Sequence, residues 1–160
     1  MAKLQAILRK YAIAPGMMEI EITEGLLIAS NSSALPILNQ LKDLGLVISL
    51  DDFGTGYSSL NYLKQFPIDV IKIDRSFTQD IDRDRQSTVI IETLIHLAQK
   101  LGLKIVAEGI ELEAQARTLV EKGCYQGQGF LFSKPVPAAA AYQFIQQCST
   151  TPGKTGNGRN

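Results

Sequence analysis

Cysteine, histidine and tryptophan are scarce in this sequence. Its 160 residues include two cysteines, one histidine and no tryptophan. The two cysteines, Cys124 and Cys148, are too few for a disulfide framework, which is typical of a reducing compartment, so we expect a cytoplasmic location. No apolar run approaches the roughly 20 residues of a membrane-spanning helix, and no membrane segment is expected.

Net charge is also absent, because sixteen basic residues balance sixteen acidic ones. A balanced chain has no overall field that would draw it to a nucleic-acid polymer or to an anionic membrane. Arg9 and Lys10 interrupt the apolar stretch near the N-terminus, which argues against a signal peptide. The length predicts one domain over residues 1–148, and the polar tail over 149–160 is expected to be disordered.

The sequence does contain a regular alternation of strand-like and helix-like segments. Short apolar runs predict strands over 18–23, 46–50, 69–74 and 103–108, followed by an irregular strand over 125–132. Helical periodicity and end signals predict helices over 3–11, 33–43, 58–65, 86–101, 112–122 and 137–148. Such an alternation implies an α/β fold with parallel strands covered by helices.

Two architectures fit this order of elements. An open, doubly wound sheet accommodates five such units in about 150 residues. A TIM-type (β/α) barrel needs ~250 residues, so this chain would form an incomplete one. Polar side chains favour the barrel, because they occur at or near the C-terminal end of every predicted strand and would converge around a barrel mouth. These residues are Glu21, Asp51, Asp52, Lys72, Glu108 and Gln128.

The stretch "VISLDDFGTGYSSL", residues 47–60, places two acids side by side where a buried strand ends. Two carboxylates at such a short distance repel each other. A bound divalent cation is the simplest way to offset the cost of this repulsion. Four carboxylates, one lysine and one carboxamide, with no histidine or cysteine among them, favour Mg²⁺ or Mn²⁺ over zinc. Two ions held by the paired acids would suit phosphodiester cleavage.

Ordinary structural roles account for each of these residues taken singly. The paired acids could cap a helix or form an Asx turn, Lys72 could extend along the surface, and Glu108 could merely end a strand. Their joint occurrence at successive strand ends favours a functional site. A receiver domain of a signalling system also uses an acidic pair and a lysine, but it matches poorly, because here the lysine follows one strand after the pair and no proline follows "KID".

Four longer motifs carry a resemblance to a known family. They are "MEIEITE", "DDFGTGYSSLNYLKQFPIDVIKIDRSF", "LGLKIVAEGIE" and "GCYQGQGFLFSKPVP", in that order over residues 18–137. With these motifs the chain resembles the EAL family of cyclic di-GMP phosphodiesterases. The resemblance implies a barrel that binds Mg²⁺ or Mn²⁺ at its mouth and linearises cyclic di-GMP to pGpG.

The resemblance also implies roles for single residues. It makes Lys72 the lysine that touches the hydrolytic water and Glu108 a catalytic acid that also binds metal. The implied metal ligands are Glu21, Asp51, Asp52 and Glu108. Gln128 and Asp74 are implied to bind the substrate.

A loop after "DDFG" couples the site to dimer contacts in the family, so a homodimer is a possible partner arrangement. Glu24 matches the acid that anchors this loop, and Glu111 matches a supporting acid. The loop residues singled out are Phe53, Gly54, Thr55 and Gly56. The two glycines permit the backbone turns that a moving loop needs.

The chain departs from the family at the start of the barrel. No Glu-Ala-Leu tripeptide occurs in it, although the glutamate of that motif is a metal ligand in the family. An upstream asparagine ligand and a basic residue that grips a substrate phosphate also have no match. We therefore expect about three strands to be missing and hydrolysis to be weak or absent unless another chain completes the barrel. The alternatives are an inactive remnant that binds a cyclic nucleotide or a protein, and a gene fragment without function.

Overall fold

The computed structural model of the chain describes residues 1–30, 33–54 and 60–150. From residue 151 on, the tail that we expect to be disordered lies outside the described residues, as do the loop residues Thr55 and Gly56. The strands are β1 (Glu19–Thr23), β2 (Val47–Phe53), β3 (Val70–Ile73) and β4 (Lys104–Ala107). The helices are α1 (Ala2–Lys10), the 3₁₀ turn η1 (Pro15–Met17), α2 (Glu24–Ser30), α3 (Leu35–Asp43), α4 (Leu60–Gln65), α5 (Arg75–Gln79), α6 (Arg85–Leu101), α7 (Glu113–Glu121) and α8 (Ala138–Thr150).

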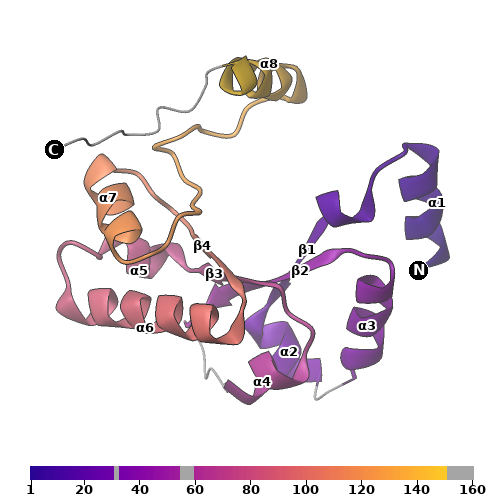
Figure 1. The fold of residues 1–160 in the computed structure, drawn as a ribbon, viewed down its shortest axis with the longest axis horizontal. Coiled ribbons are helices and arrows are strands. Elements are labelled where there is room, and N and C mark those ends of the chain that lie inside the picture. Colours follow the sequence, from indigo (N-terminus) through magenta and orange to yellow (C-terminus); the bar gives the residue numbers. More distant parts are fainter. Residues whose placement is uncertain (31–32, 55–59, 151–160) are drawn as a thin grey trace, which may run out of the picture.

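The four strands form one parallel sheet in the order β1-β2-β3-β4, with helices between them (Figure 1). In register, Ile20 lies opposite Ile48, and Ile71 lies between Leu50 and Ile105. An open doubly wound sheet reverses its strand order at a switch point, and this sheet has no such reversal. Sequential parallel strands, each followed by a helix, are the repeat of an α/β barrel, and the sheet has fewer strands than the eight of a closed barrel. The fold is an incomplete α/β barrel.

The core lies between the sheet and the helices that cover it. Every residue of β3 is buried, Lys72 included, as expected for a central strand of a parallel sheet that is covered on both faces. Helix α6 adds Ile91 and Ile95, both fully buried, and each such side chain contributes roughly 1.5–3 kcal/mol on burial. Asp84 caps this helix by accepting a hydrogen bond from Ser87 N at 2.8 Å, and Gly102 ends it at a positive φ of 69°. The predicted helix over 86–101 is therefore confirmed.

An ion pair joins the elements at the amino ends of the strands, away from the predicted site. Lys42 of α3 donates to both carboxylate oxygens of Asp69, at 2.7 and 2.6 Å. Oδ2 of Asp69 also accepts a hydrogen bond from Ile48 N of β2 at 2.8 Å. The pair fixes α3 against β2 and the start of β3, as expected for the stabilising end of a barrel.

The structure differs from the prediction in three elements: two short helices that were not predicted and one predicted strand. Helices α2 and α5 were not predicted, because α2 follows its strand without a break and contains Gly25, and α5 has only five residues. Residues 125–132 do not form a strand, and their ladder contact is a single bridge from Gly127 to Ala107. A side chain at Gly129 would collide with the backbone of Ile110, so this segment approaches its neighbour too closely for regular pairing.

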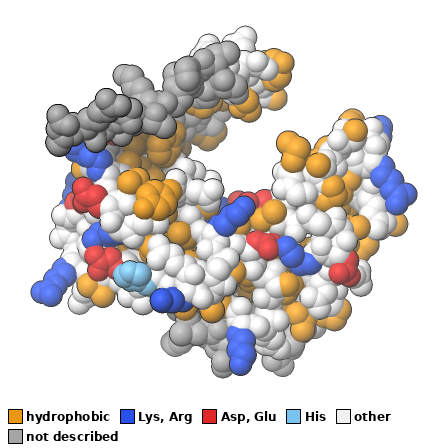
Figure 2. Space-filling view, in the orientation of Figure 1, with side chains coloured by type: hydrophobic (Ala, Val, Ile, Leu, Met, Phe, Trp, Pro, Cys, Tyr) orange, Lys and Arg blue, Asp and Glu red, His pale blue; other side chains and the backbone are white. Residues whose placement is uncertain are grey.

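Helix α8 stands apart from the sheet, while α1 lies on the opposite side of the opening (Figure 1). The space-filling view shows a broad hollow between the two, with hydrophobic side chains on both sides (Figure 2). Exposed apolar side chains of α8 include Tyr142 and Ile145, whose exposed fractions are 65% and 60%. Across the described ranges, every helix is too short or too polar to cross a membrane.

Candidate functional site

The paired acids lie inside β2 and not in the turn after it, so the predicted end of this strand at residue 50 is wrong. The strand runs to Phe53, and its pairing with β3 shifts register between Leu50 and Phe53. Asp52 has a positive φ of 56° within this irregularity. Neighbouring side chains of a regular strand point to opposite faces, but a bulge re-aims one of them. As a result, Asp51 and Asp52 bring carboxylate oxygens within 4.8 Å of each other.

Strand alternation places the remaining polar residues on the same face of the sheet. Glu21 lies opposite Ser49 in the ladder, and Ser49 lies opposite Val70. Two residues further along each strand, where side chains return to the same face, come Asp51 on β2 and Lys72 on β3. Glu108 holds the equivalent place just past β4, because Val106 lies opposite Lys72. Because side chains two residues apart along a strand point to the same face, the charged side chains of all four strands meet at one rim of the sheet.

Lys72 lies at the centre of this rim. Its exposed fraction is 4%, which excludes the surface role considered for it. Its Nζ contacts Oε1 of Glu21 at 2.7 Å and Oδ1 of Asp51 at 3.2 Å. It also contacts Oε1 of Glu108 at 2.5 Å. One buried ammonium thus binds carboxylates that come from β1, β2 and the end of β4.

Gln128 reaches the same cluster from the segment after α7. Its Nε2 donates a hydrogen bond of 2.6 Å to Oε1 of Glu108. The backbone holds Gln128 in place, because its N–H donates to Ala107 O at 2.9 Å and its carbonyl accepts from Ile110 N at 3.1 Å. Although no strand forms here, these bonds carry the side chain to the position that a strand end would have given it.

The pKa values of Lys72, Glu108 and Asp52 are all raised, for different reasons. Burial lowers the pKa of Lys72, but hydrogen bonds from its ammonium to Glu108 and Glu21, together with nearby carboxylate charge, outweigh burial and raise it overall. Burial raises the pKa of Glu108, and Lys72 offsets only part of this rise. The pKa of Asp52 is also raised, by desolvation and then by the charge of Asp51. Lys72 therefore stays charged while Glu108 holds a proton more readily than an ordinary glutamate.

The other predicted site residues surround this cluster. Asp74 caps α5 and accepts hydrogen bonds from Ser76 N at 2.9 Å and Ser76 Oγ at 2.5 Å. Although burial opposes it, these bonds lower the pKa of Asp74. Glu24 is buried at the start of α2, and Phe53 is buried at the end of β2. Gly54 follows with a positive φ of 98°, where a side chain would press on Phe77.

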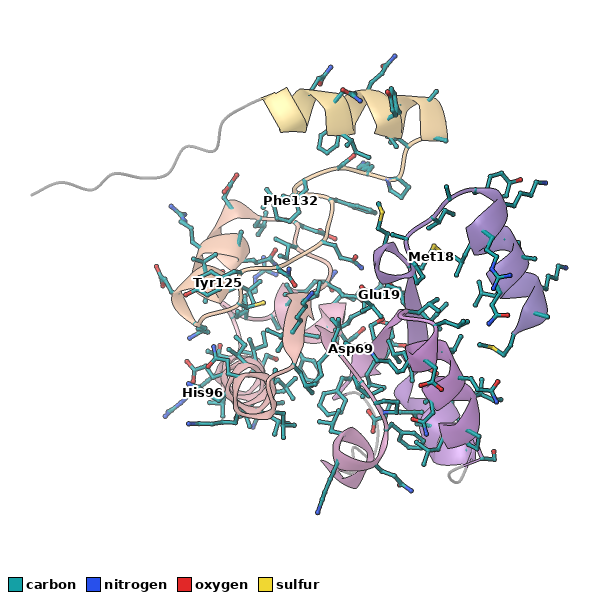
Figure 3. The ribbon with its side chains drawn as sticks, turned by 45° about the vertical axis from the view of Figure 1, so that its right-hand side comes forward. Met18, Glu19, Asp69, His96, Tyr125 and Phe132 are labelled. Atoms are coloured by element: carbon teal, nitrogen blue, oxygen red, sulfur yellow. The ribbon has the colours of Figure 1, made fainter. Side chains whose placement is uncertain are left out.

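A cavity of about 610 Å³ opens beside Glu108 and Gln128. Glu111 lies in its wall, and so does Arg75, which the sequence analysis did not single out although it directly follows "KID". The far wall comes from the segment 130–136, which includes Lys134, and from apolar side chains of α8. In Figure 3, Phe132 of that segment and Met18, just before β1, lie on the two sides of the opening above the sheet.

The rim fits a hard divalent cation. Asp51, Asp52 and Glu108 each offer one oxygen, and these oxygens all lie within 4.8 Å of one another. Within the described part of the chain, the buried Oδ1 of Asp51 has no hydrogen-bond partner, although Lys72 Nζ lies 3.2 Å away. A set of carboxylate oxygens suits Mg²⁺ or Mn²⁺. Glu21 lies on the other side of Lys72, and 53% of its side chain is exposed.

Comparison with known sequences gives consistent matches. The sequence profile of the EAL domain matches residues 1–135. The cyclic di-GMP phosphodiesterase NbdA of Pseudomonas aeruginosa is 44% identical over 139 residues, which cover 87% of this chain and 18% of that protein. The signaling protein YkoW of Bacillus subtilis is 45% identical over 138 residues, 86% of this chain and 17% of YkoW. The chain thus spans less than a fifth of the length of these relatives.

Comparison with solved structures agrees with the barrel architecture. The EAL enzyme Bd1971, in a form bound to cAMP and cyclic di-GMP, matches with a TM-score of 0.85 and 40% identity over 89% of this chain and 38% of that chain. The PaMucR phosphodiesterase in complex with c-di-GMP matches with a TM-score of 0.81 and 42% identity over 86% of this chain and 56% of that chain. A manganese and c-di-GMP complex of Klebsiella pneumoniae BlrP1 matches with a TM-score of 0.79 and 33% identity over 84% of this chain and 34% of BlrP1.

Proposed function

Because this chain belongs to the EAL domain family, we propose that it is a cyclic di-GMP phosphodiesterase-type domain that hydrolyses cyclic di-GMP to pGpG with a divalent metal. One observation carries this proposal. The buried ammonium of Lys72 joins carboxylates from three strands at the rim where such a barrel binds its ligands. A buried lysine that is paired with several partly exposed carboxylates is typical of a functional site.

The reaction adds one water molecule across a phosphodiester bond. The water oxygen attacks phosphorus, the bond from phosphorus to the 3′ oxygen breaks, and a proton passes to that oxygen to give linear pGpG. Asp51, Asp52, Glu108 and Glu21 would hold Mg²⁺ or Mn²⁺. The bound cation would polarise the phosphate and lower the pKa of the attacking water.

Protein side chains would position the water, transfer its proton and contact the substrate. The Nζ of Lys72 would donate a hydrogen bond to the attacking water and neutralise charge that develops on phosphate oxygens. Glu108 would accept the proton of that water, since its burial already favours the protonated form. Gln128 would orient Glu108 through its hydrogen bond of 2.6 Å and, with Asp74, would contact the substrate.

The residues around the loop after β2 have supporting roles in the proposal. Glu24 and Phe53 are buried and would anchor the loop, and Gly54 provides the backbone turn that leads into it. Glu111 would support the rim from the cavity wall. A homodimer coupled to this loop stays a prediction.

A second candidate function is binding of cyclic di-GMP without hydrolysis. It is favoured by the composition of the rim, because among the described residues the carboxylate oxygens that lie within 4.8 Å of one another come from Asp51, Asp52 and Glu108 alone. The four carboxylates present would then hold a metal and substrate less completely, and turnover would be slow. Cyclic di-GMP affinity and turnover, measured separately, distinguish the two functions.

Formation of pGpG from cyclic di-GMP by the purified chain with Mn²⁺ tests the proposal. Glu108→Gln keeps the size of the side chain and removes its charge, and is expected to abolish turnover. Glu113→Gln, a substitution of the same kind in the first turn of α7, is the matched control and should leave turnover unchanged. If the folded protein binds cyclic di-GMP but forms no pGpG, hydrolysis is contradicted and binding without hydrolysis is supported.

A further inference from the structure

The contacts of Lys72 raise a question about metal binding that the proposed function leaves open. Its Nζ lies 2.5 Å from Oε1 of Glu108 and 3.2 Å from Oδ1 of Asp51. Both residues also belong to the group whose oxygens could surround a cation. The ammonium therefore occupies the coordination space of two carboxylates that the proposed metal site requires.

Lys72 is the internal counter-ion of the rim. Glu21, Asp51, Asp52 and Glu108 carry four negative charges when ionised, and Lys72 supplies one positive charge. Its ammonium stays close to the rim, because β3 is buried throughout and the lysine is 4% exposed. Two cations that share these oxygens would repel each other strongly in a buried setting.

We propose that the ammonium of Lys72 and the divalent cation compete for the oxygens of Glu108 and Asp51, so that Lys72 sets the metal affinity of the site. This inference rests on the proposed function, since it assumes that the rim binds a metal. When the cation binds, Lys72 moves off Glu108 and Asp51 and keeps its contact with Oε1 of Glu21, which leaves the second carboxylate oxygen of Glu21 for the cation. Glu21 can follow this movement because 53% of its side chain is exposed.

Competition of this kind also gives selectivity for charge. A monovalent ion offers the carboxylates no more charge than the ammonium that it would displace, and it gains nothing from the exchange. A small divalent ion offers twice the charge at a short distance and can displace the ammonium. Lys72 would therefore keep Na⁺ and K⁺ out of the site while admitting Mg²⁺ or Mn²⁺. The hydrogen bond from Gln128 holds Glu108 in position during the exchange.

Mn²⁺ binding to the full chain, freed of metal with a chelator and followed by the electron paramagnetic resonance signal of free Mn²⁺, tests the inference without substrate. Lys72→Met removes the competing charge and keeps the length of the side chain. We expect this variant to bind Mn²⁺ with an affinity at least about tenfold higher than that of the unaltered chain. Lys122→Met removes a lysine that is paired with Glu92 at 2.6 Å on the far side of α6, and it should leave the affinity unchanged.

A second measurement needs no variant and covers the case in which Lys72→Met does not fold. The buried amine of Lys72 should react slowly with an N-hydroxysuccinimide ester, and mass spectrometry reports the extent of acylation at each lysine. If Mg²⁺ displaces the ammonium, acylation of Lys72 rises severalfold on addition of Mg²⁺ while acylation of Lys122 stays constant. Acylation of Lys72 that is unchanged or reduced by Mg²⁺ overturns the inference.

The possible outcomes separate this inference from the proposed function. Equal or weaker Mn²⁺ binding by Lys72→Met overturns the competition and leaves a metal-dependent phosphodiesterase intact. Mn²⁺ bound by neither protein overturns both. Tighter binding by Lys72→Met, combined with a lack of turnover by the unaltered chain, supports the competition and contradicts hydrolysis.

Discussion

The side-chain amide of Gln128 donates a hydrogen bond of 2.6 Å to Oε1 of Glu108, the oxygen that also accepts from Lys72 at 2.5 Å. Two donors thus fix one carboxylate from opposite sides of the rim. Gln128 is exposed, and so it adds little to the core. Its hydrogen bond serves to orient Glu108, and this gives a prediction that separates function from stability.

Gln128→Ala should reduce turnover or Mn²⁺ affinity by about 10–100-fold, the usual cost of losing a group that orients a metal ligand. The melting temperature should stay the same, because the side chain is exposed. Gln126→Ala, an exposed glutamine two residues earlier, is the matched control and should change neither quantity. Equal effects of the two substitutions on turnover would remove Gln128 from the site.

Gly129 is expected to be indispensable for a steric reason. A side chain there would collide with the backbone of Ile110, which cannot move without disturbing the cavity wall. Gly129→Ala should therefore lower the free energy of unfolding by about 1–3 kcal/mol, the usual cost of overpacking. Gly25→Ala is the control, because a side chain at this helical glycine meets nothing within 4 Å and should be neutral or slightly stabilising. Chemical denaturation of both variants measures the difference.

Asp84 gives a prediction on pH. Hydrogen bonds from the backbone and hydroxyl of Ser87 lower its pKa below the ordinary 3.8. A group whose pKa is depressed by folding stabilises the protein above its unfolded pKa, and loses that contribution as the pH falls through its folded value. Asp84→Ala should therefore lower the melting temperature by a few degrees at pH 7.

At a pH below the folded pKa of Asp84, most of the electrostatic part of this difference should disappear. Thermal unfolding followed by circular dichroism across the acid range measures it. A difference for Asp84→Ala that stays constant through the acid range would contradict a charged cap.

Completion of the barrel should raise activity. Fusion of the upstream part of the EAL domain of NbdA to the N-terminus of this chain would add the strands that carry the Glu-Ala-Leu motif of the family. Turnover of cyclic di-GMP should then rise at least tenfold over the chain alone, because removal of a metal ligand or its support typically costs this much. The same fusion with Glu108→Gln is the control. Equal turnover with and without the added segment would show that the residues present here suffice.

Much of the fold could be predicted from the sequence, because strands and helices of an α/β chain have distinct periodicities. The helix over 86–101 is a direct example, since Asp84 and Gly102 mark its ends. The bulge at Asp52 could not be predicted, because its positive φ depends on pairing with β3. The segment 125–132 looked like a strand because its contacts with Ile110, which prevent regular pairing, are not visible in its own residues.

Which residues form the site could be predicted from the sequence, but their arrangement in space could not. Alternation along the strands brings Glu21, Lys72 and Glu108 to one rim, and their family motifs point to the same residues. The sequence could show that Lys72 belongs to the site but not that it would contact three carboxylates, since such contacts depend on the register of separate strands. Arg75 was overlooked because a single arginine after a strand has no distinctive pattern.

The central claim is that this rim binds a divalent metal, and anomalous diffraction from a crystal soaked in Mn²⁺ tests it most directly. We expect an anomalous peak within bonding distance of the carboxylates of Asp51, Asp52 and Glu108, with the ammonium of Lys72 moved away from Glu108. A soaked crystal that shows Mn²⁺ only elsewhere on the molecule, with Lys72 still bound to Glu108, would contradict the claim.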